Sequence, residues 1–515
     1  MRRYDAVVIG SGINSLVAAA LLAKKGWKVC VLERNPWLGG AIRTEEITEP
    51  GFLHEVYSSW HALFVGSAAY AELKGDLDAR GLEYLNTELA TATLFPDGRS
   101  VFLTTSHEEN VKALGPGWEH TVAEFLPNAD IAFGLLGTEL WSRDGAKLGW
   151  KMLRRFGRRG LVEFAGNTLT SCRDWTAETF EDERVHGLFA PWVLHTGLGP
   201  DAASSGFMAQ VIGVAIELGG MPVPRGGGVE LVEALRGIVE DAGGACETGR
   251  EVERVLVELD RATGVRTADG EVIEAARAVL ANVTPQQLYA QLLGGEGPAA
   301  EEARRFRFGR GEMQIHFALS ETPDWQGDSR LGRTAIVHLT PGLDGVSRAV
   351  NEAERGLLPA EASVVVGQPM ALDPSRAPQG TWILWIQLQE VPSRPKGDAA
   401  GELGVSRGWT RKLSEAYADR IQARIAHHAP NFERSILKRV VHSPADHEAA
   451  NPNFVGGDIY SGSCALDQNL IWRPRPGLPG HQTNVERLWH IGASTHPGPG
   501  LGAGSGYLVA KALLK

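Results

Sequence analysis

The hydrophobic pattern at the start of the chain predicts a β-α-β unit. An apolar run from residue 6 to residue 9 has the length and β-branched content of a buried parallel strand. A helical run follows over 16–23, and a second apolar run over 29–32 ends on an acid, Glu33. Two glycines fall at the first turn of this unit. The order predicts an α/β protein that opens on a nucleotide-binding unit.

The residues at the first turn suit a dinucleotide. Gly10 permits the tight turn, and Gly12 lets the backbone approach a pyrophosphate at the N-terminus of the helix. Glu33 stands about twenty residues on, where a carboxylate accepts hydrogen bonds from a ribose. Ser15 replaces the third glycine of the fingerprint. The sequence shows one such fingerprint, so we expect no separate NAD(P)H-binding domain.

A second glycine pair follows the acid. Gly39 and Gly40, with Arg43 just beyond, would place backbone N–H groups and a cation along the phosphates of a cofactor. The alternative is an ordinary turn with a solvated arginine.

The rest of the chain changes from helical to strand-like patterning. Helices are predicted over 68–79, 108–114, 122–138 and 229–242, and at the C-terminus up to Leu514. Strands are predicted over 314–319, 335–339, 363–366 and 382–386, which favours a mixed or antiparallel sheet.

A basic segment interrupts the helical part. Residues 147–159 carry six lysines and arginines and no acid, with Leu, Trp, Met and Phe between them. This is the profile of an interfacial amphipathic segment, although glycines weaken a long helix. The alternative is a solvated helix face.

Composition narrows the function. A length of 515 residues suggests two to four domain-sized units, and the net charge of −11 argues against nucleic acid as a partner. The four cysteines are far apart, which fits a reducing compartment and argues against a dithiol reductase. No zinc-type spacing is present, so no metal is expected. The first strand begins at once and no apolar run reaches about 18 residues, so we expect a cytoplasmic protein without a leader or membrane span.

Several motifs resemble one family. They are E-R-x₃-L-G-G-x₃-T at 33–44, A-N-x-x-P at 281–285, D-P-S-R-A-P at 373–378, N-P-N-F-V-G-G-D at 451–458 and G-A-S at 492–494. In this order they resemble the phytoene-dehydrogenase-like branch of FAD-dependent oxidoreductases, which is related to carotenoid desaturases and includes proteins with a pyridine nucleotide-disulphide oxidoreductase domain. The resemblance runs from residue 4 to residue 512.

The resemblance implies an α/β fold of the amine oxidase and phytoene desaturase type. A discontinuous Rossmann-type FAD-binding domain would hold an inserted α+β substrate domain. The expected FAD-binding parts are 1–67, 221–290 and 485–515. The expected substrate-domain parts are a helical 68–220, with a membrane or lid segment at 147–164, and a sheet-containing 291–484.

The resemblance also assigns site residues. The expected FAD-binding residues are Gly10, Gly12, Ile13, Asn14, Glu33, Arg34, Gly39, Gly40, Ala41, Arg43, Val252, Asn282, Gly492, Ala493, Gly500 and Leu501. His54 and His61 are candidates for groups near the isoalloxazine, and His195 is a candidate pocket residue. Each histidine has a structural alternative, as a polar residue satisfied in a loop or core.

The implied reaction is desaturation of an apolar aliphatic, cyclic or isoprenoid-like substrate by hydride transfer to flavin N5. Oxygen, a quinone or another acceptor would reoxidise the FAD. Amine oxidation, flavin-dependent isomerisation and a non-catalytic FAD-binding scaffold are the alternatives. Peripheral membrane contact and homo-oligomerisation stay open.

Overall fold

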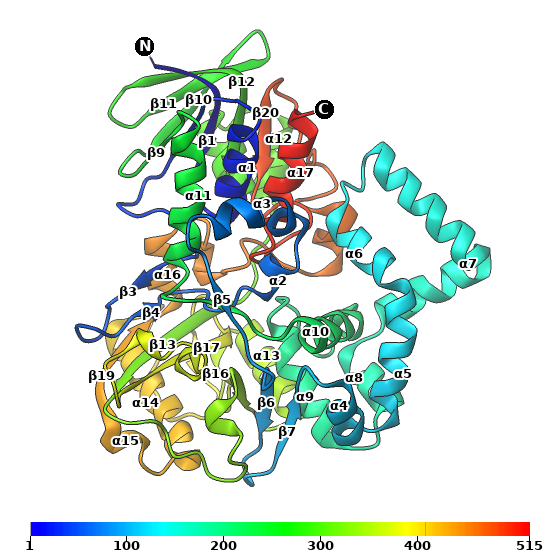
Figure 1. Ribbon diagram of the computed structural model, residues 1–515, viewed down its shortest axis with the longest axis vertical. Helices are drawn as coiled ribbons and strands as arrows, with labels where there is room; N and C mark the ends of the chain where they lie inside the picture. The colour runs from blue at the N-terminus through cyan, green and yellow to red at the C-terminus, as the bar shows by residue number, and fades with distance from the viewer. Residues whose placement is uncertain (1, 407) are drawn as a thin grey trace.

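The computed structural model describes residues 2–406 and 408–515, which build two seven-stranded sheets. The first sheet lies in the upper half of Figure 1, close to both ends of the chain, and the second lies in the lower half. Segments distant in sequence join in each sheet, so neither half is one continuous stretch of chain. The α/β fold class predicted from the sequence is confirmed.

The first sheet contains the predicted nucleotide-binding unit. Its strands, in spatial order, are β10 (Val252–Glu258), β11 (Arg261–Thr267), β12 (Val272–Asn282), β1 (Arg2–Ile9), β2 (Val29–Leu32) and β9 (Ala245–Glu247), and β20 (Leu488–Ile491) pairs with β12. β1 pairs in parallel with both β2 and β12, and β20 is parallel to β12. β9 is also parallel to β2, so the carboxyl ends of five parallel strands meet at one edge, where ligands bind in open α/β sheets.

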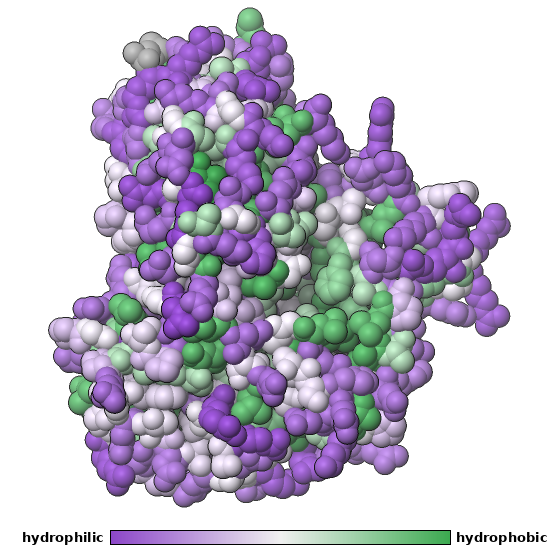
Figure 2. All heavy atoms as spheres, viewed as in Figure 1, coloured by the Kyte–Doolittle hydropathy of each residue, from purple (hydrophilic) through white to green (hydrophobic). Residues whose placement is uncertain are grey.

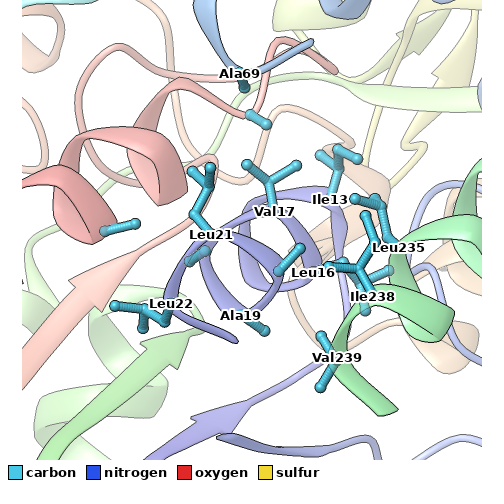
Figure 3. Close-up of a cluster of buried hydrophobic side chains, with 14 of the residues drawn as sticks. Ile13, Leu16, Val17, Ala19, Leu21, Leu22, Ala69, Leu235, Ile238 and Val239 are labelled. Carbon is cyan, nitrogen blue, oxygen red and sulfur yellow. The ribbon is translucent and has the colours of Figure 1, made fainter. Parts of the chain in front are cut away.

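Helix α1 (Ile13–Ala23) is buried along its whole length. Its apolar side chains face α11 (Val229–Asp241), as Figure 3 shows for Leu16 beside Leu235 and Ile238. Helix α17 (Gly504–Leu513) packs so closely on α1 that a Cβ at Gly506 would lie 1.9 Å from the carbonyl oxygen of Asn14. The three helices hold the first turn of the chain rigidly against the sheet.

The second sheet is assembled from the middle of the chain. Its order is β19 (Ile436–His442), β13 (Gly311–Leu319), β17 (Trp382–Val391), β16 (Val364–Gly367), β14 (Ile336–Leu339), β6 (Thr91–Leu94) and β7 (Ser100–Leu103). All the pairs are antiparallel except β14 with β6, so the predicted mixed sheet is present.

Two predictions about the helical segment need correction. The part expected to be helical from residue 68 also contributes the hairpin β6–β7, which extends the second sheet. The single helix predicted over 122–138 is divided at Leu126–Asn128, because Pro127 removes a backbone donor and restricts the residue before it. The two resulting helices are α5 (Pro116–Phe125) and α6 (Ala129–Gly137).

The basic segment lies on α7 (Arg143–Leu169), which projects from the body of the molecule on the right of Figure 1. No residue of α7 is buried within the described part of the chain. Gly157 has φ +65° and ψ −178°, so the helix is kinked where the sequence places a glycine among the arginines.

The remaining elements cover these sheets or connect them. The helices are α2 (Ala62–Val65), α3 (Ala68–Asp78), α4 (His107–Leu114), α8 (Cys172–Thr179), α9 (Glu183–Leu194), α10 (Ser205–Gly219), α12 (Pro298–Arg304), α13 (Leu343–Glu354), α14 (Arg411–His428), α15 (Phe432–Ser435) and α16 (Pro444–Ala450). The short strand pairs are β3 (Thr44–Glu45) with β4 (His54–Glu55), β5 (Tyr84–Leu85) with β8 (Val223–Pro224), and β15 (Leu357–Leu358) with β18 (Gly397–Asp398).

A buried ionic cluster joins the loop between β16 and β17 of the second sheet to the short strands β4 and β8. Arg376, fully buried, donates to Glu55 at 2.7 Å, to Asp373 at 3.1 Å and to the carbonyl of Pro224 at 2.6 Å. Glu55 also accepts a hydrogen bond from the backbone N–H of Gly228 at 2.8 Å. The D-P-S-R-A-P motif thus forms a structural junction.

Candidate active site

A cavity of about 1420 Å³ extends from the edge of the first sheet to the second sheet. The residues that follow β1, β2 and β20 line one end, and Gln314, Trp385 and Gln387 of the second sheet line another part. The cavity therefore connects the predicted nucleotide-binding edge with the predicted substrate domain.

The cavity end at the first sheet is shaped by glycines that pack on one side chain. Gly10 has φ +83°, which favours glycine, and a Cβ on Gly12 would come within 3.1 Å of the Asn282 amide nitrogen. A Cβ on Gly492 would lie 2.1 Å from the amide oxygen of Asn282. Asn282 in turn donates to Ser15 Oγ at 3.0 Å. These contacts leave bare backbone beside the cavity, as close approach to a pyrophosphate requires.

Two helix N-termini border the cavity. α1 begins after Gly12 and α17 begins after Ala503, and neither of these residues supplies a capping side chain. In the first turn of α17, the N–H of Gly506 donates to Asn14 Oδ1 at 3.0 Å. Asn14 and Gly504, each in a first turn, line the cavity. Free N–H groups and the positive end of the helix dipole suit an anionic ligand group. The residues present therefore fit a dinucleotide.

Glu33 is buried at the end of β2 and lines the cavity. Its carboxylate accepts hydrogen bonds from Ser11 N at 3.0 Å, Ser11 Oγ at 2.7 Å and Asn35 N at 2.9 Å. These bonds hold an acceptor at the second strand end, where the fingerprint expects a ribose.

Most of the expected FAD-binding residues lie on this cavity. The lining members are Gly10, Gly12, Ile13, Asn14, Glu33, Arg34, Gly39, Gly40, Ala41, Val252, Asn282, Ala493, Gly500 and Leu501. Arg43 and Gly492 lie outside the lining. Arg43 donates to Glu45 at 2.6 Å and stacks 3.7 Å above the Trp37 ring, and Gly492 donates its N–H to Ser505 Oγ at 3.0 Å.

His195 is the one expected catalytic histidine that lines the described cavity. It follows α9, stacks on Trp192 with 4.5 Å between ring centroids, and its Nε2 lies 3.2 Å from Nε2 of His338. Burial lowers the pKa of His195 to about 3, so its ring is neutral at physiological pH. A neutral imidazole is an acceptor and a donor, not a cation.

His54 and His61 are placed away from the cavity lining. The Nε2 of His54 lies 2.7 Å from Thr48 Oγ1, and its ring packs edge-on against His316. The Nδ1 of His61 lies 2.9 Å from the Tyr84 hydroxyl. Burial lowers the pKa of both histidines to about 3. His54 thus has a hydrogen bond of the kind that its structural alternative requires, whereas Nε2 of His61 is buried without a hydrogen-bond partner among the described residues. A role for either histidine near the isoalloxazine stays a prediction.

The sequence reasoning missed a polar group on the second sheet. Glu312 and Gln314 of β13 and Gln387 and Gln389 of β17 all line the cavity and are nearly fully buried. The available signal was polar residues at alternate positions in two otherwise apolar strands, because alternate residues share one face.

The remaining wall is apolar, and so is the rim. Helix α10 contributes Phe207, Met208, Val211, Ile212 and Ala215 to the lining. Lining residues that are also exposed form what we call the rim: Leu63, Phe133, Leu169, Leu218, Ile471 and Trp472. Figure 2 shows hydrophobic side chains gathered around a hollow in the region of α10 and α6.

Fold and site together define the class: an oxidoreductase built on a Rossmann-type dinucleotide domain. The NAD(P)-binding Rossmann-like domain family matches residues 8–74. The pyridine nucleotide-disulfide oxidoreductase domain-containing protein 2 of Mus musculus is 27% identical, covering 99% of this chain and 93% of that protein.

Two further relatives match at similar identity and coverage. One component of the limonene dehydrogenase of Castellaniella defragrans is 25% identical over 99% of this chain and 94% of its own. The neurosporene-forming phytoene desaturase of Cereibacter sphaeroides is 25% identical over 98% and 94%. These alignments cover nearly all of this chain and of each relative, and the resemblance predicted from its motifs is confirmed.

Solved structures show the same fold. An oxidoreductase from Methanosarcina mazei has a TM-score of 0.61 at 15% identity, covering 99% of this chain and 100% of that one. Putrescine oxidase bound to putrescine also has a TM-score of 0.61 at 15% identity, with 99% of each chain covered. The dinucleotide cradle fits the FAD cofactor that the sequence motifs predict.

The length and polarity of the helices decide whether any of them could cross a membrane. Within 2–406 and 408–515, each helix is too short or too polar to traverse a bilayer.

Proposed function

We propose that this oxidoreductase dehydrogenates a largely apolar aliphatic, cyclic or isoprenoid-like substrate in the cavity described above. The main observation in support is that one cavity extends from the dinucleotide cradle to an apolar wall on α10. When bound, FAD supplies a two-electron acceptor that takes a hydride from carbon. The limonene dehydrogenase and phytoene desaturase relatives support a hydrocarbon substrate.

The chain's own residues would hold FAD and exclude water. We infer that the backbone at Gly12 and the first turn of α1 bind the pyrophosphate and that Glu33 binds the ribose. The lining of α10 and the stacked pair of Trp192 and His195 would keep the reacting carbon dry. With its pKa near 3, His195 would act as a neutral positioning group. The two sheets support the division into a three-part FAD domain and a two-part substrate domain.

The test is an anaerobic titration of the FAD-loaded protein, followed by the absorbance of oxidised flavin. Phytoene and limonene represent the hydrocarbon substrates, and putrescine represents the amines. Bleaching by a hydrocarbon supports the proposal, with the acceptor then sought among oxygen and quinones. Bleaching by amines alone would replace the proposal with amine oxidation, the second candidate. Glu312, in the polar group on the second sheet, favours that candidate because a carboxylate can pair with an ammonium group. A flavin that nothing bleaches would leave isomerisation or a scaffold role.

We further propose that the rim and α7 contact an anionic membrane surface, from which an apolar substrate could enter. Trp150 is 62% exposed on α7, and Arg154 and Arg158 are exposed on the same helix. Apolar and cationic side chains together suit binding at the lipid headgroup level.

Membrane contact is tested by sedimentation with phosphatidylglycerol vesicles. The double variant Arg154→Glu/Arg158→Glu should lose most vesicle binding, because each basic residue contributes about 1 kcal/mol near an anionic surface. The matched control, Lys412→Glu/Lys438→Glu, changes exposed lysines elsewhere and should bind as the wild type does. Equal binding by both double variants would refute the contact.

A further inference from the structure

The strongest unexplained feature is the polar group on the cavity side of the second sheet. Gln314 of β13 is paired directly with Gln387 of β17, and Glu312 lies two residues before Gln314. Gln389 lies two residues after Gln387, and the pairing of the two strands shifts register between Gly311 and Met313. Each of them lines the cavity.

Within this group, Glu312, Gln314 and Gln389 have side-chain oxygens without partners, whereas the amide nitrogens of Gln314 and Gln389 are engaged. Both carboxyl oxygens of Glu312 and the amide oxygens of Gln314 and Gln389 are buried and lack a hydrogen bond of good geometry within the described residues. The side chains of Gln387 and Gln314 nevertheless lie close enough to Glu312 to favour its charged form. Gln314 Nε2 donates to the carbonyl of Tyr57 at 2.9 Å, and Gln389 Nε2 donates to the Tyr460 hydroxyl at 3.0 Å. The cluster therefore places unpartnered acceptors in the wall of the cavity.

Such a cluster lowers the stability of the fold unless a hydrogen-bond donor reaches its oxygens. A buried polar atom without a hydrogen bond costs free energy, and a buried carboxylate without a counter-charge costs more. Glu312 is only 2% exposed, and the charge of Asp458 opposes ionisation of the Glu312 carboxyl instead of compensating it. A ligand that brought several donors and a positive charge would satisfy all of these groups together.

We propose that Glu312, with the side-chain amide oxygens of Gln314 and Gln389, forms a subsite for the ammonium group of a substrate whose remaining part is apolar. An ammonium carries three donors and one positive charge, whereas a hydroxyl supplies one donor and no charge. The proposal rests on the proposed function only in placing the substrate in this cavity. It departs from a pure hydrocarbon, because it requires an amine on an otherwise apolar substrate.

The proton balance of binding gives a signature. Burial raises the pKa of Glu312 to about 8, with smaller opposing effects from Gln387 and Gln314, so the carboxyl is mostly protonated at pH 7. The titratable groups around it are Asp458 and Tyr460, whose pKa values are both raised by burial. An ammonium that pairs with the Glu312 carboxylate must displace the carboxyl proton. Binding should release about one proton at pH 7 and almost none at pH 9.

The experiment is calorimetric titration of the FAD-loaded protein with n-octylamine under anaerobic conditions. Titrations in buffers of different ionisation enthalpy give the number of protons released. The matched neutral ligand is 1-octanol. Glu312→Gln keeps the size and polarity of the side chain and removes its charge, and Glu433→Gln removes an exposed carboxyl elsewhere as the control.

We expect octylamine to bind the wild type with proton release at pH 7, and Glu312→Gln to weaken it about 30-fold or more, as for loss of one partner of a buried charge pair. Octanol binding and the Glu433→Gln variant should be unchanged. The proposal is overturned if the wild type does not bind octylamine, if Glu312→Gln binds it equally well, or if octanol binding falls to the same extent.

Two features keep the outcome decisive. Should Glu312→Gln fail to fold, proton release and its disappearance by pH 9 in the wild type still test the subsite. Flavin bleaching is recorded in the same samples. Binding without bleaching supports the subsite and counts against oxidation of this amine, whereas bleaching by hydrocarbons with no octylamine binding supports the proposed function and removes the subsite.

Discussion

At the residue scale, Asn282 explains why the cradle needs glycine. Its amide group lies against the positions that a Cβ would occupy at Gly12 and Gly492. Gly12 therefore needs to lack a Cβ for two reasons: the backbone must come close to a ligand, and the Asn282 side chain occupies the space of a Cβ. A pattern of glycines in the sequence predicts the first requirement, but the second depends on a residue about 270 positions away.

This arrangement predicts the effect of Gly12→Ala. The added Cβ would lie 3.1 Å from Asn282 Nδ2, so Asn282 or the loop must move. We expect FAD affinity to fall roughly tenfold, corresponding to about 1.4 kcal/mol of overpacking. The measurement is flavin fluorescence quenching during reconstitution of apoprotein. Gly149→Ala is the control, because a Cβ there meets nothing within 4 Å. Equal affinities for both variants would show that the Asn282 contact does not shape the cradle.

The histidines show where residue-level prediction stops. His54, His61 and His195 look alike in sequence, as polar residues in apolar surroundings. Only the structure separates His195, on the cavity wall, from His54 and His61, whose rings are engaged by Thr48 and Tyr84. The difference depends on which side of a loop packs inward, and no periodic pattern encodes that in irregular chain.

At the element scale, local units were predictable and their pairings were not. The β-α-β unit and strands such as β13 and β17 follow from hydrophobic runs, because neighbouring residues determine them. The register that places Gln314 opposite Gln387 joins strands about 70 residues apart. The sequence of each strand alone predicts a buried strand. The polar surface toward the cavity becomes evident only when β13 is paired with β17.

The junction around Arg376 carries the second prediction. Its guanidinium is fully buried between Glu55 and Asp373, and Arg376→Ala would leave both carboxylates without that partner. Removing one partner of a buried pair costs about 3–5 kcal/mol, so we expect that loss in the free energy of unfolding. Urea denaturation measures it. Arg394→Ala, at an exposed arginine, should change stability by less than about 0.5 kcal/mol. If Arg376→Ala lowered the free energy of unfolding by no more than Arg394→Ala does, solvent would have to reach the buried carboxylates of the junction.

At the scale of the whole molecule, buried histidines dominate the expected response to acid. Burial lowers the pKa to about 3 for His54, His61, His195 and His447, and to about 4 for His428, His490 and His496. It also lowers the pKa of His316 and His338, well below the usual value. In the unfolded chain each would titrate near 6.5. The unfolded state therefore binds more protons than the folded state once the pH falls below about 6.5.

Stability must then fall with pH, because protons favour the state that binds more of them. Each such histidine contributes up to about 1.4 kcal/mol per pH unit between its unfolded and folded pKa values. Glu312, Glu390 and Asp458 act in the opposite direction, since burial raises their pKa values and the folded state keeps their protons. The histidines outnumber these acids, so we expect the melting temperature to be highest near neutral pH and to fall steadily from pH 6.5 to pH 5. Differential scanning calorimetry of the FAD-loaded protein checks this, and His447→Gln should make the decline shallower because His447 no longer titrates. A melting temperature that stays level or rises on acidification would show that these rings are hydrated or paired in the folded protein.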